Sequence, residues 1–225
     1  HASQLHLVLT DERLPMEPAD NGVFELETTA AGPGTRYHFL LDDDGPFPDP
    51  ASRFQPEGVH GPSEVVNPDA FAWGDSDWTG VPREALVIYE LHVGTFTPEG
   101  TFDAVRERLD YLKSLGVTAI ELMPVHDFPG ERNWGYDPAA LFAPSRAYGR
   151  PDALRRLVDA ALFGSNLLES RDERSTDRVL GQFGLEVNIY ILIVHLEVRL
   201  FEFRLDCPGE TRLGIMGGER IDDLL

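Results

Sequence analysis

The chain has 225 residues, and its 39 acidic and 19 basic side chains give it a formal charge of −20 at pH 7. Such a charge repels phosphate backbones and anionic lipid heads, so it argues against nucleic acid and membrane surfaces as partners and leaves neutral ligands such as sugars open. Cys207 is the only cysteine, which excludes an intramolecular disulfide and a cysteine-rich metal site, and we expect no cofactor.

Residues 1–80 are predicted to form a small β domain followed by a linker. Three leucines near the start occupy alternate positions, as in a strand with one buried face: Leu5, Leu7 and Leu9. Residues 23–28 and 37–41 predict further strands, and the second runs into an Asp-Asp-Asp-Gly hairpin turn. Strands this closely spaced predict an antiparallel, immunoglobulin-like β-sandwich. Residues 46–68 are rich in proline, glycine and serine, so we expect an extended linker on the surface.

The middle of the chain changes to the hydrophobic period of a parallel α/β domain. Residues 86–93 predict a buried strand, and residues 117–123 predict a second one. Between them, Thr101 or Asp103 is placed to cap a helix that Gly116 would end in a left-handed conformation. A strand, a helix and a strand in this order predict a βαβ unit with parallel strands.

A further helix is predicted from Pro151, with an apolar face made of Leu154, Leu157, Val158 and Ala161. Residues 81–161 therefore have the pattern that begins a parallel (β/α)₈ barrel or a doubly wound sheet. In both folds the chemistry lies beyond the carboxyl ends of the strands, so the segments after residues 93 and 123 are the candidate sites.

The segment from residue 124 to 149 is unusually long and mixes flat aromatic with hydrogen-bonding side chains: His126, Asp127, Arg132, Asn133, Trp134, Tyr136 and Asp137. Aromatic faces stack on the C–H patches of a pyranose, and the polar groups can satisfy its hydroxyls. From the residues alone, however, a loop with Trp and Tyr between Gly and Pro is more often a packed structural loop, and that reading is favoured over a sugar site.

Three other polar residues in this part also have structural readings. No second histidine stands at ligand spacing from His126, so we interpret His126 as a hydrogen-bonded structural residue and expect no metal site. Glu90 and Glu121 lie within the two predicted strands, where they are either buried polar groups or functional groups that point into a barrel.

Several stretches together resemble the start of the (β/α)₈ barrel in the α-amylase superfamily of glycoside hydrolases: Val-Ile-Tyr-Glu-Leu-His-Val-Gly-Thr-Phe-Thr at 87–97, Leu-Gly-Val-Thr-Ala-Ile-Glu-Leu-Met-Pro-Val at 115–125, Asn-Trp-Gly-Tyr-Asp-Pro at 133–138, and Phe-Ala-Pro-Ser at 142–145 with Tyr148-Gly149. Upstream, residues 48–63 resemble the junction between the N-terminal β-sandwich and the barrel in malto-oligosyltrehalose trehalohydrolases. Glycogen branching enzymes have a similar layout, but Asp137-Pro138 favours the trehalohydrolases.

This resemblance implies an endo-acting enzyme that cleaves the α-1,4 bond next to the terminal trehalose of malto-oligosyltrehalose. It makes Tyr136 the aromatic platform beneath the sugar, with Trp134 and Asp137 in its hydrogen-bonded surround. The family's chemistry is a retaining mechanism in which one carboxylate is the nucleophile, a second is acid and then base, and a third orients the sugar.

The resemblance covers residues 3–161 and then ends, at the point where the composition changes. Every alanine lies at or before Ala161, and Pro208 is the only later proline. The Asp-x-x-x-Asn-His motif that should end a third strand does not occur, so we expect that strand to be absent and identify no catalytic carboxylate. Phe203-Arg-Leu-Asp206 resembles the family's nucleophile strand, but the residues after it differ, and we interpret Asp206 as a chance match.

Residues 162–225 are therefore predicted to be an unmatched tail, as a frameshifted or fused reading frame would produce. Its segment 189–194 is apolar, β-prone and uncharged, and would be an aggregation hazard if exposed.

We expect an α-1,4-glucan or malto-oligosyltrehalose as the ligand, and a partial glycoside hydrolase that is inactive as this chain. A branching-enzyme fragment and a non-catalytic glucan-binding module are the alternatives. No basic-then-apolar leader opens the chain and no apolar run is long enough to span a bilayer, so a cytoplasmic location is expected, and the oligomeric state stays open.

Overall fold

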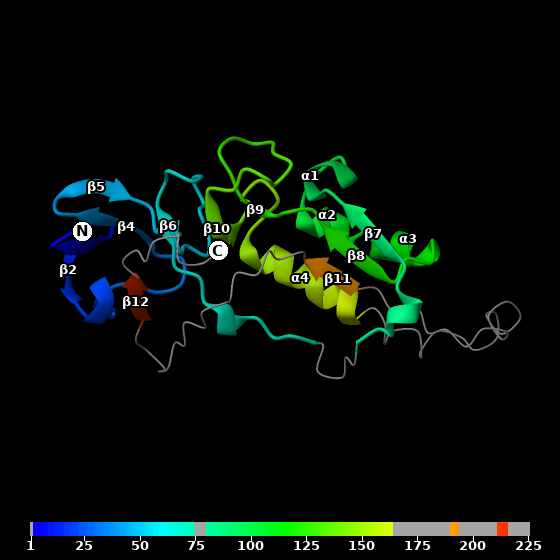
Figure 1. Cartoon of the computed structure of the whole chain (residues 1–225), viewed down its shortest axis with the longest axis horizontal. Helices are drawn as coiled ribbons and strands as arrows, with labels where there is room; N and C mark the ends of the chain where they lie inside the picture. The colour runs from blue at the N-terminus through cyan, green and yellow to red at the C-terminus, as the bar shows by residue number, and fades with distance from the viewer. Residues whose placement is uncertain (1, 75–79, 164–189, 194–210, 216–225) are drawn as a thin grey trace, which may run out of the picture.

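The computed structural model describes residues 2–74, 80–163, 190–193 and 211–215. An antiparallel sheet forms one end of the molecule, and a parallel sheet with helices forms the other (Figure 1). A small hairpin, β9 (His126–Asp127) and β10 (Ala140–Pro144), lies between them. Within the described residues, no helix is long and apolar enough to cross a membrane.

The antiparallel sheet has seven strands in the order β12-β3-β2-β1-β4-β5, with β6 paired to β4. The strands are β1 (Leu5–Val8), β2 (Arg13–Pro18), β3 (Phe24–Thr28), β4 (Arg36–Leu41), β5 (Asp44–Phe47), β6 (Ser63–Glu64) and β12 (Thr211–Ile215). A short 3₁₀ turn at Asp20–Gly22 connects β2 to β3. The strands predicted at residues 5–9, 23–28 and 37–41 are confirmed.

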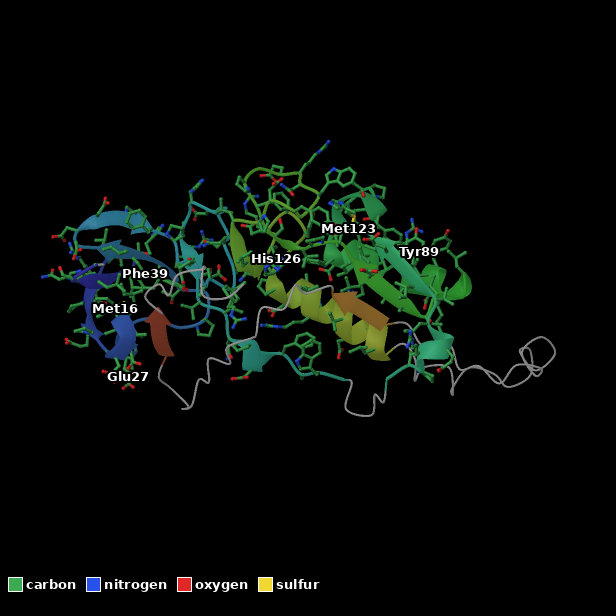
Figure 2. The ribbon with its side chains drawn as sticks, in the orientation of Figure 1. Met16, Glu27, Phe39, Tyr89, Met123 and His126 are labelled. Atoms are coloured by element: carbon green, nitrogen blue, oxygen red, sulfur yellow. The ribbon has the colours of Figure 1, made fainter. Side chains whose placement is uncertain are left out.

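The core of this sheet comes from the predicted alternation. Leu5 and Leu7 are buried with Met16 from β2 and with Tyr37 and Phe39 from β4. Figure 2 shows Met16 and Phe39 within this part of the molecule. Because side chains alternate between the two faces of a strand, these five share one apolar face.

The predicted hairpin turn joins β4 to β5. Asp42 and Asp43 both have positive φ, 50° and 69°, which is the conformation that a tight hairpin requires at its two central residues. Aspartate tolerates this conformation better than most residues because its short side chain can hydrogen-bond locally. The Asp42 side chain in addition bonds to a distant part of the chain: its Oδ1 accepts hydrogen bonds from the backbone N–H groups of Ser3 and Gln4, both at 2.8 Å.

The prediction that residues 46–68 run over the surface is wrong for much of that segment. Asp49, Phe54, Gln55 and Ser63 are all buried. The backbone N–H of Asp49 donates to Ser63 Oγ at 2.9 Å, and Gln55 Nε2 donates to the same oxygen at 3.2 Å. Polar residues can be buried when they satisfy one another in this way, and composition alone does not reveal such a network.

The parallel sheet has the order β11-β8-β7, with β7 (Ile88–Leu91), β8 (Ala119–Leu122) and β11 (Tyr190–Ile193). β7 and β8 are parallel, with Ile88 opposite Ala119, which confirms the predicted βαβ arrangement. β11 pairs parallel to the other edge of β8. A segment of the tail therefore takes the position of a third strand, although the Asp-x-x-x-Asn-His motif of the family's own third strand does not occur in the sequence.

Three details of the parallel part differ from prediction. Residues 86–89 were expected to be buried, but their apolar side chains are exposed because β7 is the edge strand of the described sheet. The strand is also shorter, and Val93 begins the short helix α1 (Val93–Phe96). The predicted single helix is two, α2 (Phe102–Arg106) and α3 (Leu109–Ser114), since the backbone of Arg108 leaves the helical region at φ −100°, ψ 2°.

The predicted ends of this helical region are confirmed. Thr101 caps α2, since its hydroxyl accepts a hydrogen bond from the N–H of Ala104 at 3.2 Å, which satisfies one of the free donors at a helix start. Gly116 follows α3 with a φ of +82°. The helix predicted from Pro151 is α4 (Pro151–Phe163), and its Leu157 joins the core of the parallel part.

Two short 3₁₀ turns, Pro68–Ala70 and Arg83–Ala85, lie on the path between the two parts. After the first turn, the chain contacts α4 where the N–H of Gly74 donates to Asp159 Oδ1 at 2.6 Å. A second contact ties α2 to α4: Arg156 donates to both carboxylate oxygens of Asp103, at 3.2 and 2.9 Å.

Candidate functional site

The three predicted site residues lie on the loop between β9 and β10, beyond the carboxyl end of β8. Trp134 is 75% exposed and Tyr136 is 65% exposed, and Asp137 is exposed beside them. The reading of a packed structural loop is wrong for these two aromatic rings, since neither is packed into the core. The loop presents two large flat rings and a carboxylate to solvent.

Local geometry fixes the shape of this loop. Gly135 has a φ of +95°, and a Cβ at this position would overlap with the carbonyl oxygen of Pro124. Its N–H donates to Asn133 Oδ1 at 2.7 Å, and Asn133 Nδ2 lies 3.4 Å from Asp137 Oδ2. The backbone between the two aromatic rings is therefore buried and held although the rings are exposed.

The backbone of the same loop is also held by the side chains of two residues, His92 and Tyr148, which the sequence did not single out for this role. The carbonyl oxygen of Asn133 lies 2.7 Å from His92 Nε2 and 3.3 Å from the Tyr148 hydroxyl. His92 follows β7 directly, but the sequence placed it inside the predicted strand 86–93, so only the family resemblance of residues 87–97 included it. Tyr148 was visible only as part of a family resemblance.

Tyr148 is itself fixed by the core. It is 3% exposed, and its ring makes edge-to-face contacts with the rings of Phe102 and Phe128, at centroid distances of 5.8 and 5.9 Å. Its carbonyl oxygen accepts a hydrogen bond from the N–H of Phe102 at 2.9 Å. Burial raises the pKa of the Tyr148 hydroxyl, so this group stays protonated and able to donate at neutral pH.

The other end of the loop is anchored by Arg146. Its Nη1 donates to Glu131 Oε1 at 3.0 Å and its Nη2 to the carbonyl oxygen of Gly130 at 3.3 Å. The backbone N–H of Arg146 donates to Asp127 Oδ1 at 3.3 Å. Asp127 is buried, and burial is the main reason that its pKa is raised.

His126, the candidate structural histidine, is half-buried in β9 and has interaction partners. Figure 2 shows it between the two parts of the molecule. Among the residues that the structure describes, no group of three or more His, Cys, Asp or Glu side chains could hold a metal ion.

Glu90 and Glu121 stand directly opposite each other on β7 and β8. Leu91 and Leu122, one position later, belong to the core under the helices. Because side chains alternate along a strand, the two glutamates face the other side of the sheet, where the inside of a barrel would be. Glu90 is exposed and Glu121 is half-buried, so the prediction of a buried polar group is wrong for Glu90.

The region around the loop is open. A groove of about 570 Å³ lies at the end of β7 and is lined in part by His92, Thr95, Arg108 and Tyr111. It borders the loop anchor through His92, but Trp134 and Tyr136 do not line it. Around this loop, the described residues thus form an open surface rather than an enclosed cleft.

Comparison with known proteins places this geometry in a family context. Residues 65–162 match the family model described as Alpha amylase, catalytic domain. The malto-oligosyltrehalose trehalohydrolase of Saccharolobus solfataricus is 54% identical over 146 residues, which cover 65% of this chain and 26% of that protein. The same enzyme of Deinococcus radiodurans is 56% identical over 146 residues, covering 65% and 24%.

A solved structure agrees with the sequence matches. The crystal structure described as a putative α-amylase from Salmonella typhimurium superimposes with a TM-score of 0.69 at 47% identity, over 72% of this chain and 28% of that one. The chain spans about a quarter of the length of the curated relatives it matches. Over the residues that these comparisons cover, the protein is similar to a part of malto-oligosyltrehalose trehalohydrolases and to a part of the α-amylase catalytic domain.

Proposed function

We propose that residues 2–163 form the N-terminal, glucan-binding part of a trehalohydrolase-type glycoside hydrolase. The observation that carries the proposal is the pair of exposed rings, Trp134 and Tyr136, on a loop whose backbone is fixed at the carboxyl end of the parallel strands. The ligand is an α-1,4-glucan, with malto-oligosyltrehalose as the preferred form, since the similar enzymes are named for it.

The chemistry of the loop suits a sugar. A glucose ring placed on Tyr136 would bury apolar C–H surface against the phenol face, and Trp134 offers a second face. The Asp137 carboxylate can accept hydrogen bonds from sugar hydroxyls. A neutral glucan does not experience the repulsion that the net charge of −20 exerts on anionic ligands.

The chain by itself is proposed to be catalytically incomplete. Glycosidases need two positioned carboxyl groups that flank the scissile bond, one of them protonated. Glu90 and Glu121 lie within strands, and neither is at the exposed loop that carries Trp134 and Tyr136. We therefore assign no catalytic residue, and expect the purified chain to release no trehalose from malto-oligosyltrehalose. Release of trehalose at a rate above that of heat-denatured protein would contradict this.

Three finer assignments accompany the proposal. The antiparallel sheet supports an immunoglobulin-like β-sandwich as the domain over residues 1–80. The parallel strands support a truncated (β/α)₈ barrel over 81–161, with residues 162–225 as an added tail. The location is proposed to be cytoplasmic.

The alternative functions are a branching-enzyme fragment and a glucan-binding module that never takes part in hydrolysis. Asp137-Pro138 in the loop favours the trehalohydrolase type over the branching enzyme. The binding module predicts the same glucan affinity but no preference for a trehalose end. Comparing maltoheptaose with malto-oligosyltrehalose of equal length therefore separates it from the main proposal.

The experiment is calorimetric titration of the 225-residue chain with maltoheptaose, supported by retardation in amylose-containing native gels. We expect binding, and expect Tyr136→Ala to abolish it because the stacking surface is lost. Tyr111→Ala is the matched control, since Tyr111 is also an exposed tyrosine, on α3 and 53% exposed. Absence of binding by the wild-type chain, or equal losses in both variants, would overturn the proposal.

A further inference from the structure

We propose that Tyr148 and His92 are positioning residues for the glucan: together they hold the Asn133 carbonyl and thereby set the orientation of Trp134 and Tyr136. The inference rests on the proposed function. Neither side chain belongs to the exposed surface that would bind the glucan. His92 contacts the loop from the end of β7, and Tyr148 contacts it from the segment before α4.

The hydrogen-bonding roles follow from the acceptor. A carbonyl oxygen can only accept, so His92 Nε2, 2.7 Å away, carries the hydrogen. The Nδ1 atom is then free to accept from the Thr95 hydroxyl, which lies 3.3 Å away. The Tyr148 hydroxyl, 3.3 Å from the same carbonyl oxygen, is the second donor. Thr95, His92 and Tyr148 thus form a short network that ends on one loop carbonyl.

The position of the Asn133 carbonyl in the loop lets it set the orientation of the Trp134 and Tyr136 side chains. It belongs to the peptide bond between Asn133 and Trp134, so any rotation of that peptide plane tilts Trp134 directly. The next residue, Gly135, donates its N–H to the side chain of the same Asn133 at 2.7 Å. Two donors on one carbonyl and one acceptor on the same residue fix the backbone that leads to Tyr136.

The Tyr148 side chain, one of the two donors, is held rigidly by its packing, whereas the two aromatic side chains that would contact the glucan are not. Tyr148 is packed between Phe102 and Phe128, and a Cβ on Gly94 would approach its ring at 2.9 Å. Trp134 and Tyr136, in contrast, project into solvent. A binding surface of exposed rings loses affinity when the rings must be ordered on binding, because the ordering costs conformational entropy. The Tyr148–His92 network lowers that cost by ordering the backbone beforehand.

The first test removes a single oxygen atom. Tyr148→Phe should weaken maltoheptaose binding by about three- to tenfold, the range expected for one hydrogen bond. It should also accelerate hydrogen exchange at the Gly135 amide in the absence of any sugar, because the loop opens more often. Tyr111→Phe, at an exposed tyrosine, is the matched control and should change neither quantity.

The second test uses the shape of the donor at His92. In His92→Gln the amide nitrogen can occupy the place of Nε2, whereas in His92→Asn it can reach only the place of Nδ1. We expect His92→Gln to retain most of the affinity and of the Gly135 protection, and His92→Asn to lose both. Circular dichroism checks that each variant is folded. If Tyr148→Phe does not fold, the comparison of His92→Gln with His92→Asn decides whether the positioning role holds.

The outcomes separate this inference from the proposed function. If the wild-type chain does not bind maltoheptaose, the proposed function fails, while the exchange rate at Gly135 still reports whether the network holds the loop. If the wild-type chain binds and folded Tyr148→Phe and His92→Asn match it in affinity and exchange, the positioning role is overturned. A loss of affinity with unchanged exchange also contradicts it, because the effect must act through the loop.

Discussion

Gly135 shows how one residue can decide the geometry of the candidate site. A left-handed backbone costs a non-glycine residue about 1–2 kcal/mol, and at Gly135 a side chain would in addition collide with the Pro124 backbone. Gly130, on the same loop, has a similar φ of +88° but open space around it. The backbone strain of an added Cβ is therefore similar at the two glycines, whereas the collision occurs only at Gly135.

We predict that Gly135→Ala lowers the free energy of unfolding by about 1–3 kcal/mol more than Gly130→Ala does, which is the usual cost of overpacking. Urea denaturation of both variants measures the difference. Gly135→Ala should also abolish glucan binding, because relief of the collision moves the loop. Equal free energies of unfolding for the two variants would show that the loop absorbs the added methyl without cost.

Asp49 gives a residue-scale prediction about pH. Burial raises the pKa of Asp49, more than the hydrogen bonds from Tyr37 and Ala51 lower it. The folded chain therefore holds this proton to a higher pH than the unfolded chain, so the contribution of Asp49 to stability is full below about pH 4 and is lost as pH rises through the folded pKa.

Asp49→Asn should remove this dependence while keeping an acceptor for the Tyr37 hydroxyl, which donates to Asp49 Oδ2 at 2.7 Å. Between about pH 4 and 7, the free energy of unfolding should fall less steeply for Asp49→Asn than for the wild type. Asp69→Asn, at an exposed aspartate, is the control and should follow the wild-type curve. A steeper fall in Asp49→Asn would refute the assignment. Urea unfolding at several pH values provides the data.

At the scale of elements, the segment that was expected to be a surface linker packs against β10 and against the start of α4. Arg150, just before α4, lies over the ring of Phe54 at 4.7 Å and pairs with Glu64, whose side chain is 5% exposed. Arg53 in turn lies 5.9 Å from the ring centroid of Phe142 in β10. Residues 49–64 are therefore packed against both parts of the molecule.

We predict that Arg150→Ala lowers the free energy of unfolding by about 1–3 kcal/mol, because it leaves the buried Glu64 carboxylate without its cation. Arg155→Ala is the control: Arg155 is on α4 and pairs with Asp152 one turn away, an i,i+3 contact of the kind that contributes about 0.5 kcal/mol or less. Denaturant titration of both variants tests the difference. A larger loss in Arg155→Ala would contradict the role given to Arg150.

The sequence predicted elements well where the signal is local. Alternating Leu5 and Leu7, the cap at Thr101 and the left-handed Gly116 each depend on near neighbours, and each is confirmed. The burial of residues 49–64 depends on partners far along the chain, such as Arg150 for Glu64. The Tyr148–His92 network was missed for the same reason, since its members come from separate elements.

At the scale of the whole molecule, β7 is an open edge. Within the described sheet it pairs only with β8, and the side chains of Val87 and Ile88 are 52% and 50% exposed. An uncovered strand edge with apolar residues is a template for pairing with another chain. The net charge of −20 opposes such contact between copies.

We therefore predict weak self-association that becomes stronger as salt screens the charge. Sedimentation velocity at low and high ionic strength should show a rising average mass, and Ile88→Lys should suppress it. Leu115→Lys adds the same charge at another exposed apolar residue, after α3, and should have less effect. Association that is insensitive to Ile88→Lys would place the contact elsewhere.

Two short segments of the tail have a consequence that extends across the molecule. β11 completes the described parallel sheet beside β8, and β12 extends the antiparallel sheet beside β3. Both strands belong to the same stretch of chain after α4, so this one stretch contributes a strand to each sheet. Removal of the chain after α4 would therefore take one strand from each of the two sheets and leave β8 and β3 as new sheet edges.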